Sequence, residues 1–488
     1  MVTDEFGGVD MPSGPIVATR TGRVQGRTRD GIAEHRGIPF ASDPTGNLRL
    51  AAPAPHPGWT GVLDAMRPGP ACPQPPSRLN ALMGEPVSTF DEAGCLTVNV
   101  WTPDVRASLP VLFWMHGGAW VSGSASWDWY SGARLAAKEG IVVVTANHRL
   151  GALGYLGIDG GNFGFLDQVA ALEWTTENVA AFGGDPGLIT VGGQSAGAES
   201  AAMLAAAPRT CGSVRRLLLQ SGGVNGLAQP AAQAAAVAAD FVDIIGGDPA
   251  RLRTAPVDEL LAAQVELIGR RGAGLVPPFG VIESDDVPSG GTVEFLRARD
   301  SIATSSLDVM VGWARDELFG FTGLDPRSAS LTDEDVVGAV GAAVDADYRG
   351  LRPSATPAQR LAAINGNRFL MAPTLRLAED RASRGEPTFV YRFDWSGSEC
   401  GACHCIDLPF TFGNLDAWPG ASMLGGATAE SLVDLADRFG ASIGEFVRTG
   451  RAPWPAHDTS TKTVARFDAD RTDVVPGLAQ DELAALGQ

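Results

Sequence analysis

Short apolar runs alternate with helix-forming stretches through much of the chain. Six runs are largely apolar, as is typical of strands buried on both faces of a sheet: residues 111–115, 141–144, 188–191, 217–219, 307–312 and 389–393. Stretches between them, such as 131–138 and 166–179, have the composition of helices. This alternation predicts an α/β fold with a mostly parallel central sheet flanked by helices.

The start of the chain has a different pattern. Residues 16–28 alternate apolar and polar positions, which predicts a strand or a hairpin, and 96–102 alternate in the same way. Residues 36–76 are rich in proline and glycine, so we predict an ordered but irregular surface segment there.

Two helical regions interrupt the alternation. Residues 230–272 are rich in alanine and leucine, and 331–381 also have a mostly helical composition. We expect both to be helical insertions above the sheet that wall a substrate cavity. Residues 431–448 predict a closing amphipathic helix. Because no repeat or domain boundary is visible, we interpret 1–488 as a single catalytic domain.

Composition narrows the classes of function. Of 488 residues, 44% are hydrophobic, enough for a large core, and the net charge of −19 argues against binding to nucleic acid or to an anionic membrane. No run approaches the ~18 apolar residues of a membrane span. The first residues lack the pattern of a secretory signal, and six cysteines in so long a chain are no disulfide framework. We therefore predict a cytoplasmic protein.

Candidate chemistry begins at Ser195. Residues 193–197 read Gly-Gln-Ser-Ala-Gly, between the apolar run 188–191 and an alanine-rich helical stretch, and fit the pattern G-x-S-x-G. In that pattern a sharp strand-to-helix turn presents the serine as a nucleophile above the sheet. A simple glycine-rich turn is the alternative, since the chain has 61 glycines.

A serine nucleophile needs a general base and an acid that orients the base. Only His404 and His457 follow Ser195, and we favour His404 because it comes directly after the apolar run 389–393. The run 307–312 is followed by Asp316 and Glu317, and spacing alone does not choose between these two acids. A solvated charged loop is the alternative interpretation of this segment.

An oxyanion hole needs backbone N–H donors. Residues 116–120 read His-Gly-Gly-Ala-Trp after the apolar run 111–115, like the loop that supplies such donors in lipases and esterases. The N–H of Ala196, next to the nucleophile, is the expected partner donor.

Taken together, these residues resemble the type B carboxylesterase family, which includes cholinesterases and bacterial para-nitrobenzyl esterases. The resemblance covers almost the whole chain, in segments at 37–40, 95–101, 167–172, 181–186, 194–198, 219–222, 315–317 and 404–414. It implies the α/β-hydrolase fold, Glu317 rather than Asp316 as the acid, and N–H donors at Gly118, Ala119 and Ala196. Gln194 departs from the family's usual glutamate, which argues against choline esters.

The cysteines raise two further questions. Cys72 and Cys95 match the family's N-terminal disulfide, although a cytoplasmic location leaves its closure open. Residues 400–404 fit the c-type haem attachment motif, and Cys400, Cys403 and Cys405 surround His404. Haem or zinc there would occupy the proposed base, so we predict no cofactor and no metal, and interpret these cysteines as buried thiols or a local redox pair.

The sequence thus predicts a serine hydrolase that cleaves carboxylic esters of small molecules through an acyl-enzyme, with Ser195, Glu317 and His404 as its triad. Hydrolysis of aryl carbamates or amides by the same triad is the alternative, and a non-catalytic interaction protein of the same fold is a remote one. Candidate pocket aromatics are Trp120, Phe319, Phe321 and Trp418, with Trp127 and Trp129 as further candidates.

Overall fold

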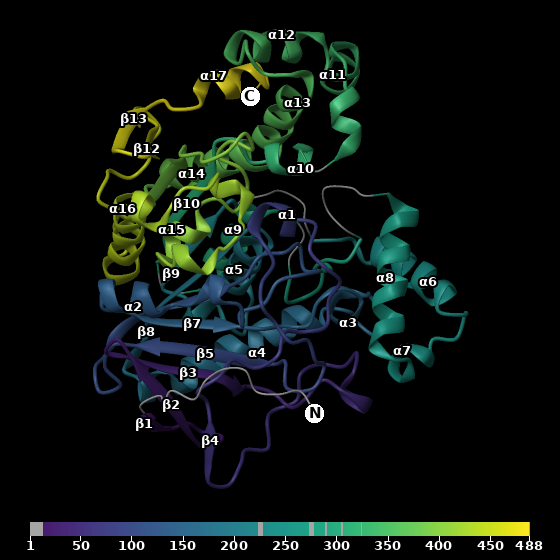
Figure 1. Ribbon diagram of the computed structural model, residues 1–488, viewed down its shortest axis with the longest axis vertical. Coiled ribbons are helices and arrows are strands. Elements are labelled where there is room, and N and C mark those ends of the chain that lie inside the picture. The colour runs from purple at the N-terminus through teal and green to yellow at the C-terminus, as the bar shows by residue number, and fades with distance from the viewer. Residues whose placement is uncertain are drawn as a thin grey trace.

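A sheet of 13 strands runs through the computed structural model, which describes residues 13–222, 228–272, 278–287, 290–303, 306–323 and 325–487 (Figure 1). The strands are β1 (Ser13–Ala18), β2 (Arg23–Arg29), β3 (Ile32–Pro39), β4 (Val62–Asp64), β5 (Thr97–Thr102), β6 (Leu109–Met115), β7 (Val142–Ala146), β8 (Gly184–Gln194), β9 (Arg216–Gln220), β10 (Asp308–Ala314), β11 (Thr388–Phe393), β12 (Thr463–Phe467) and β13 (Thr472–Pro476).

The order across the sheet is β1-β2-β3-β5-β7-β6-β8-β9-β10-β11-β12-β13, with β4 beside β2. Strands from β7 to β12 in this order are parallel. The strands at both ends pair antiparallel, except that β4 pairs parallel with β2. The fold is therefore the predicted α/β-hydrolase type. From β6 the chain passes to β7 on one side and then to β8 on the other, so a crevice opens above the carboxyl ends of β6 and β8.

Both faces of the sheet are buried, as the continuous apolar runs predict. In β6, Val111, Phe113 and Met115 face one core and Leu112 and Trp114 face the other. All five side chains are inaccessible to solvent. This two-sided burial explains why the central strands lack an apolar–polar alternation.

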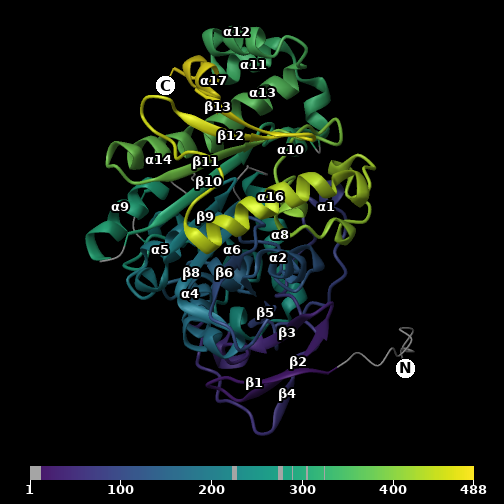
Figure 2. The same ribbon diagram turned by 90° about the vertical axis from the view of Figure 1, so that its left-hand side faces the viewer.

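Helices cover both faces of the sheet (Figures 1 and 2). They are α1 (Asn80–Met83), α2 (Ala133–Glu139), α3 (Gly151–Tyr155), α4 (Phe163–Asn178), α5 (Ala196–Ala206), α6 (Ala231–Ile244), α7 (Arg251–Thr254), α8 (Val257–Arg271), α9 (Thr292–Ile302), α10 (Phe319–Gly323), α11 (Asp333–Val340), α12 (Ala342–Leu351), α13 (Pro357–Gly366), α14 (Ala372–Ser383), α15 (Leu408–Phe412), α16 (Ala429–Thr449) and α17 (Gln480–Ala485). None of the helices in the described ranges is both long and apolar enough to cross a membrane.

The two regions predicted as insertions are helical. Region 230–272 forms α6, α7 and α8, which lie together at one side of the molecule, and region 331–381 forms α11 to α14 with a π-helical turn at Asn367–Met371 (Figure 1). The closing helix α16 begins where the Thr428 side chain accepts the N–H of Ser431, and it ends at Gly450, whose φ is 72°.

One part of the prediction for residues 36–76 is wrong, because β3 extends to Pro39 and β4 lies at Val62–Asp64. Strand β3 carries Glu34, His35 and Arg36, and all three are buried. Each has a polar partner: Glu34 pairs with Arg27 at 2.7 Å, the His35 ring bonds to the Pro15 carbonyl at 3.0 Å, and Arg36 pairs with Asp128. Buried polar groups that are paired in this way leave no hydrophobic period in the sequence.

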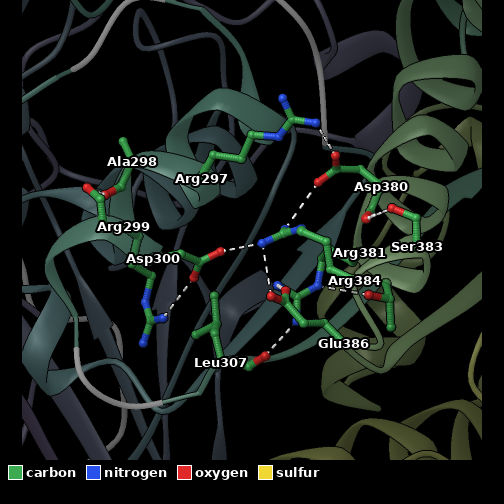
Figure 3. A network of polar contacts seen from close by, with 12 residues as sticks. Arg297, Ala298, Arg299, Asp300, Leu307, Asp380, Arg381, Ser383, Arg384 and Glu386 are labelled. Carbon is green, nitrogen blue, oxygen red and sulfur yellow. Dashed lines mark hydrogen bonds and ion pairs between the residues drawn. The ribbon is translucent and has the colours of Figure 1, made fainter.

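A network of ion pairs and hydrogen bonds joins helix α9 to helix α14 (Figure 3). Arg384 bridges Asp300 at 2.7 Å and Asp380 at 3.1 Å. The buried Arg381 donates to the Leu307 carbonyl at 2.7 Å, next to the start of β10. The network holds these helices on the strand that leads to the candidate acid.

Cys72 and Cys95, the candidate disulfide pair, are both free thiols in the structure. They are buried side by side, and burial together with a hydrogen bond to Cys95 raises the pKa of Cys72. The structure therefore brings together the pair that the resemblance identified, and it has the open form of a pair whose closure the sequence left undecided.

Candidate active site

Ser195 lies at the sharp turn between β8 and α5, with φ 57° and ψ −130°. Such a positive φ is strained for a non-glycine residue and is typical of functional positions. The flanking glycines make the turn fit. A Cβ on Gly193 would lie 2.3 Å from the Gly197 carbonyl carbon, and a Cβ on Gly197 would lie 2.2 Å from the Met115 carbonyl oxygen. The G-x-S-x-G pattern is therefore a packing requirement here.

His404 and Glu317 form a buried hydrogen-bonded pair. His404 Nδ1 lies 2.6 Å from Glu317 Oε2, and the His404 backbone N–H donates to the Glu317 carbonyl at 3.0 Å. Glu317 Oε1 accepts the Ala314 N–H at 2.8 Å, which holds the carboxylate at the end of β10. Because the carboxylate accepts from Nδ1, the proton of neutral His404 belongs on Nδ1 and Nε2 is left as the basic nitrogen.

In the structure the side-chain amide of Gln194 is hydrogen-bonded to that basic nitrogen of His404. Gln194 Nε2 lies 3.2 Å from His404 Nε2, and the Cys405 thiol donates to Gln194 Oε1 at 3.5 Å. Within the described ranges, Ser195 Oγ has no hydrogen-bond partner, although Ser195 and His404 line the same cavity. The sequence identified Gln194 as unusual, but only the structure reveals its contact with the base.

The alternative acid and base have other roles. Asp316 accepts from Arg352 at 2.6 Å and from Arg315 at 2.9 Å, and it does not contact His404. Burial raises the pKa of this carboxyl, but the two arginines outweigh burial and hold the pKa below its usual value. His457 lies between α16 and β12, where its ring bonds to the Thr463 carbonyl at 3.1 Å. The structure thus separates both from the cavity.

The loop after β6 presents free backbone donors. Gly118, Ala119 and Trp120 all have positive φ, at 119°, 54° and 58°. The Gly118 carbonyl accepts the N–H groups of Val121 and Ser122, each at 3.0 Å, while no described group accepts the N–H of Gly118 or Ala119. The N–H of Ala196 is free in the same way, in the first turn of α5. Three donors therefore border the nucleophile.

Two stacked, buried histidines pack at the start of this loop. The rings of His116 and His148 are buried and lie 4.7 Å apart at an angle of 9°. Burial lowers the pKa of His116 to about 4 and that of His148 well below its usual value. Both rings are therefore neutral at physiological pH, and His116 Nδ1 lies 2.9 Å from the Gly117 carbonyl oxygen.

The cavity above Ser195 has a volume of about 350 Å³. Trp120 and Phe321 line it, together with Val265 and Ile268 of α8 and Phe369 and Leu370 of the π-helical turn. Side chains from both helical regions therefore contribute to its wall. This volume and its apolar lining suit a small organic molecule.

The structure places the other predicted pocket aromatics elsewhere. Phe319 packs against the core of α11 to α13, under the Arg352 guanidinium at 5.6 Å. Trp418 stacks on Trp129 with ring centroids 4.7 Å apart, and Trp127 packs edge-on to Trp129. The three tryptophans belong to the same core as Leu112 and Trp114 of β6. The positions of all four aromatics therefore do not support contact with substrate.

The cysteines around His404 are poorly placed for chemistry. Cys403 and Cys405 are buried, and burial raises the pKa of both thiols. The reactive thiolate is therefore disfavoured. In the described part of the chain, no cluster of three or more histidine, cysteine or acidic side chains could hold a metal ion.

Comparison with known proteins places this geometry in context. Residues 13–482 match the carboxylesterase family. Similar proteins include a probable N-octanoylanthranilate hydrolase from Rhodococcus erythropolis (35% identical, over 90% of this chain and 95% of the relative) and the phenmedipham hydrolase of Pseudarthrobacter oxydans (35%, over 91% of each). The para-nitrobenzyl esterase of Bacillus subtilis is 32% identical, over 94% of this chain and 95% of the relative.

The solved structures that resemble this chain are also carboxylesterases and para-nitrobenzyl esterases. A carboxylesterase of Geobacillus stearothermophilus superposes with a TM-score of 0.84 at 33% identity, covering 96% of this chain and 99% of the other. A thermophilic para-nitrobenzyl esterase superposes with a TM-score of 0.83 at 31% identity, with the same coverage.

Proposed function

Because the chain belongs to the carboxylesterase family and is a carboxylic-ester hydrolase, we propose that Ser195, His404 and Glu317 are its catalytic triad. The observation that carries the proposal is the 2.6 Å bond between His404 Nδ1 and Glu317 Oε2, beside a strained serine in the same cavity. This bond fixes the imidazole tautomer whose Nε2 can take a proton from Ser195.

The reaction follows from this arrangement. His404 Nε2 leaves the Gln194 amide and accepts the Ser195 proton while Oγ attacks the acyl carbonyl carbon. The N–H groups of Gly118, Ala119 and Ala196 hold the negative oxygen of the tetrahedral intermediate. The carbonyl re-forms as the leaving group departs with the proton from His404, which leaves an acyl-serine. Water, deprotonated by His404, then releases the acid in the same manner.

A fluorophosphonate probe tests the assignment. Such probes phosphonylate an activated serine with loss of fluoride, so the purified protein should be labelled on Ser195 and lose hydrolysis of 4-nitrophenyl butyrate in step. The Ser195→Ala variant should take no label and show no hydrolysis above background. Labelling that persists in Ser195→Ala would overturn the proposal, and so would a variant that keeps its activity.

The leaving-group preference is the finer part of the proposal. Two relatives are named for hydrolysis of N-octanoylanthranilate and phenmedipham, which supports amide or carbamate hydrolysis as a second activity. Nitrogen deactivates the carbonyl of a carbamate, and an amide also needs a proton delivered to a poor leaving amine. We therefore expect kcat/KM to fall from a short-chain aryl ester to the matched carbamate and anilide. A carbamate or anilide cleaved faster than the ester would reverse this order.

We also propose that the enzyme lies in the cytoplasm and acts on small molecules. All six cysteines are free thiols, which suits the reducing conditions of the cytoplasm. The net charge of −19 supports small-molecule substrates rather than nucleic-acid partners.

A further inference from the structure

The cavity above Ser195 continues into a larger outer hollow. The outer hollow has a volume of about 930 Å³, and it shares Arg78, Leu318, Phe321 and Phe369 with the inner cavity. A substrate whose carbonyl lies at Ser195 can therefore extend past these four side chains. The shared boundary makes the outer hollow the natural place for the part of a substrate distant from the scissile bond.

The outer hollow carries positive charge that the protein does not balance. Its charged lining consists of Arg78, Arg327, Arg368 and Asp325. Arg327 is neutralised by Asp325 at 2.7 Å, whereas the Arg368 guanidinium donates to the Val340 carbonyl, at 3.5 Å. Across the described ranges, no carboxylate lies within ion-pair distance of Arg78 or Arg368.

This charge is opposite in sign to that of the whole chain, which has 56 acidic and 37 basic residues. Many arginines elsewhere pair with the abundant carboxylates, as in the network of Figure 3. Two unbalanced guanidinium groups beside an apolar cavity therefore define a local field that attracts anions. The planar guanidinium fork is well suited to a carboxylate.

Aromatic groups lie at the same boundary. Phe321 and Phe369 are half-buried and line both the inner cavity and the outer hollow. Phenyl rings in such positions stack against an arene. The outer hollow thus combines an aromatic surface with two unpaired cations.

We propose that the outer hollow is a subsite for an anionic aromatic group, so that the preferred substrates are esters, carbamates or amides with an aromatic carboxylate. In this arrangement the arene contacts Phe321 and Phe369, and its carboxylate pairs with Arg78 and Arg368. The proposal rests on the proposed function, because it assigns the orientation of substrates cleaved at Ser195.

Matched esters test this subsite on both sides of the scissile bond. The leaving-group arm compares 4-nitrophenyl butyrate with 3-carboxy-4-nitrophenyl butyrate. The acyl arm compares the 4-nitrophenyl esters of 3-phenylpropanoate and 3-(4-carboxyphenyl)propanoate. Steady-state kinetics are measured for the wild type, Arg78→Gln, Arg368→Gln and the double variant. Arg451→Gln, which removes a cation that lines neither space, is the control for net charge.

In at least one arm, each single variant should lower kcat/KM for the carboxylated ester about fivefold, and the double variant should lower it by more. The loss should lie mainly in KM and should shrink at high salt. In the same variants kcat/KM for the matched neutral ester should fall by less than for the carboxylated ester. Arg451→Gln should keep kcat/KM for both esters within about twofold of the wild type. Thermal unfolding of each variant checks that the fold is intact.

Two results would overturn the subsite. One is an equal effect of the variants on carboxylated and neutral esters in both arms, and the other is no effect in either arm. Neither result touches the proposed function, which fails separately if the wild type hydrolyses no neutral ester or if Ser195→Ala remains active.

Discussion

The Gln194 amide lies on the nitrogen of His404 that has to receive the serine proton, with 3.2 Å between the two Nε2 atoms. Because Glu317 accepts from Nδ1, His404 Nε2 carries a lone pair and the amide donates to it. The Cys405 thiol, which donates to Gln194 Oε1, holds the amide in this orientation. Gln194 therefore stabilises the neutral imidazole and competes with Ser195 for it.

Gln194→Glu should move the acidic limb of the kcat/KM profile to higher pH by about one unit, because a carboxylate at this distance stabilises the imidazolium. The profile is measured with 4-nitrophenyl butyrate from pH 5 to 9. Gln194→Met, which removes the donor without adding charge, should give a smaller shift. An acidic limb that stays in place in Gln194→Glu would contradict the contact.

Glu317→Gln should lower kcat by about a thousandfold or more, because a neutral amide no longer stabilises the charged His404. Asp316→Asn should lower kcat by less than about tenfold, since Asp316 contacts Arg315 and Arg352 instead of the base. Its main effect should be a lower Tm. The measurements are kcat and Tm of both variants. A larger loss of kcat in Asp316→Asn than in Glu317→Gln would show that Asp316 is the acid.

Stability should fall in acid because of His116. Its pKa is about 4 in the folded protein and about 6.5 when unfolded, so the unfolded chain binds more protons between these values. The stabilisation is complete above pH 6.5 and is lost as the pH falls toward 4, by about 3 kcal/mol for this group. Urea unfolding at pH 7, 6 and 5 measures the slope.

The matched variants are His116→Gln and, as control, His56→Gln, a half-buried histidine outside the oxyanion loop. The slope should become shallower in His116→Gln and stay unchanged in the control. The same slope in all three proteins would show that His116 remains accessible to protons in the folded state.

A buried ion pair near the site should be sensitive to the loss of one partner. Asp167 accepts from Arg149 Nε at 2.8 Å and from Nη2 at 2.7 Å, and both side chains are buried. Asp167→Asn leaves a buried cation without its counter-charge and should lower the free energy of unfolding by about 3–5 kcal/mol.

Glu173→Gln is the control, because Glu173 pairs with Arg209 on the surface at 2.6 Å. It should cost less than about 1 kcal/mol. Equal losses in Asp167→Asn and Glu173→Gln, measured by urea unfolding, would mean that burial does not govern the strength of these pairs.

Much of the fold and site could be predicted because the relevant signals are local. The apolar runs that form β6 and β8 and the glycines around Ser195 are dictated by burial and by close backbone approach. Strand β3 was missed because its buried polar residues bond to other segments, at Pro15, Arg27 and Asp128, and so do not form an apolar run. The chemistry of a side chain does not reveal such partners.

The pocket aromatics show the same limit. Trp120 and Trp418 are equally large and apolar in the sequence, but Trp120 lines the cavity and Trp418 stacks on Trp129. Which ring faces a cavity depends on how elements that are distant in the sequence pack together, and the local sequence does not show this. The Gln194–His404 contact also depends on tertiary packing, because one partner comes from β8 and the other from the loop after β11.

The pairing of β6 with β8, in which Met115 lies opposite Gly193, also has a kinetic consequence. Strand β7 and helix α4 lie between these strands in the sequence, so contact order is high where the oxyanion loop joins the nucleophile. His404 arrives later still, from beyond β11. Esterase activity should therefore return among the last signals during refolding, after most helical circular dichroism, which makes it a sensitive reporter of complete assembly.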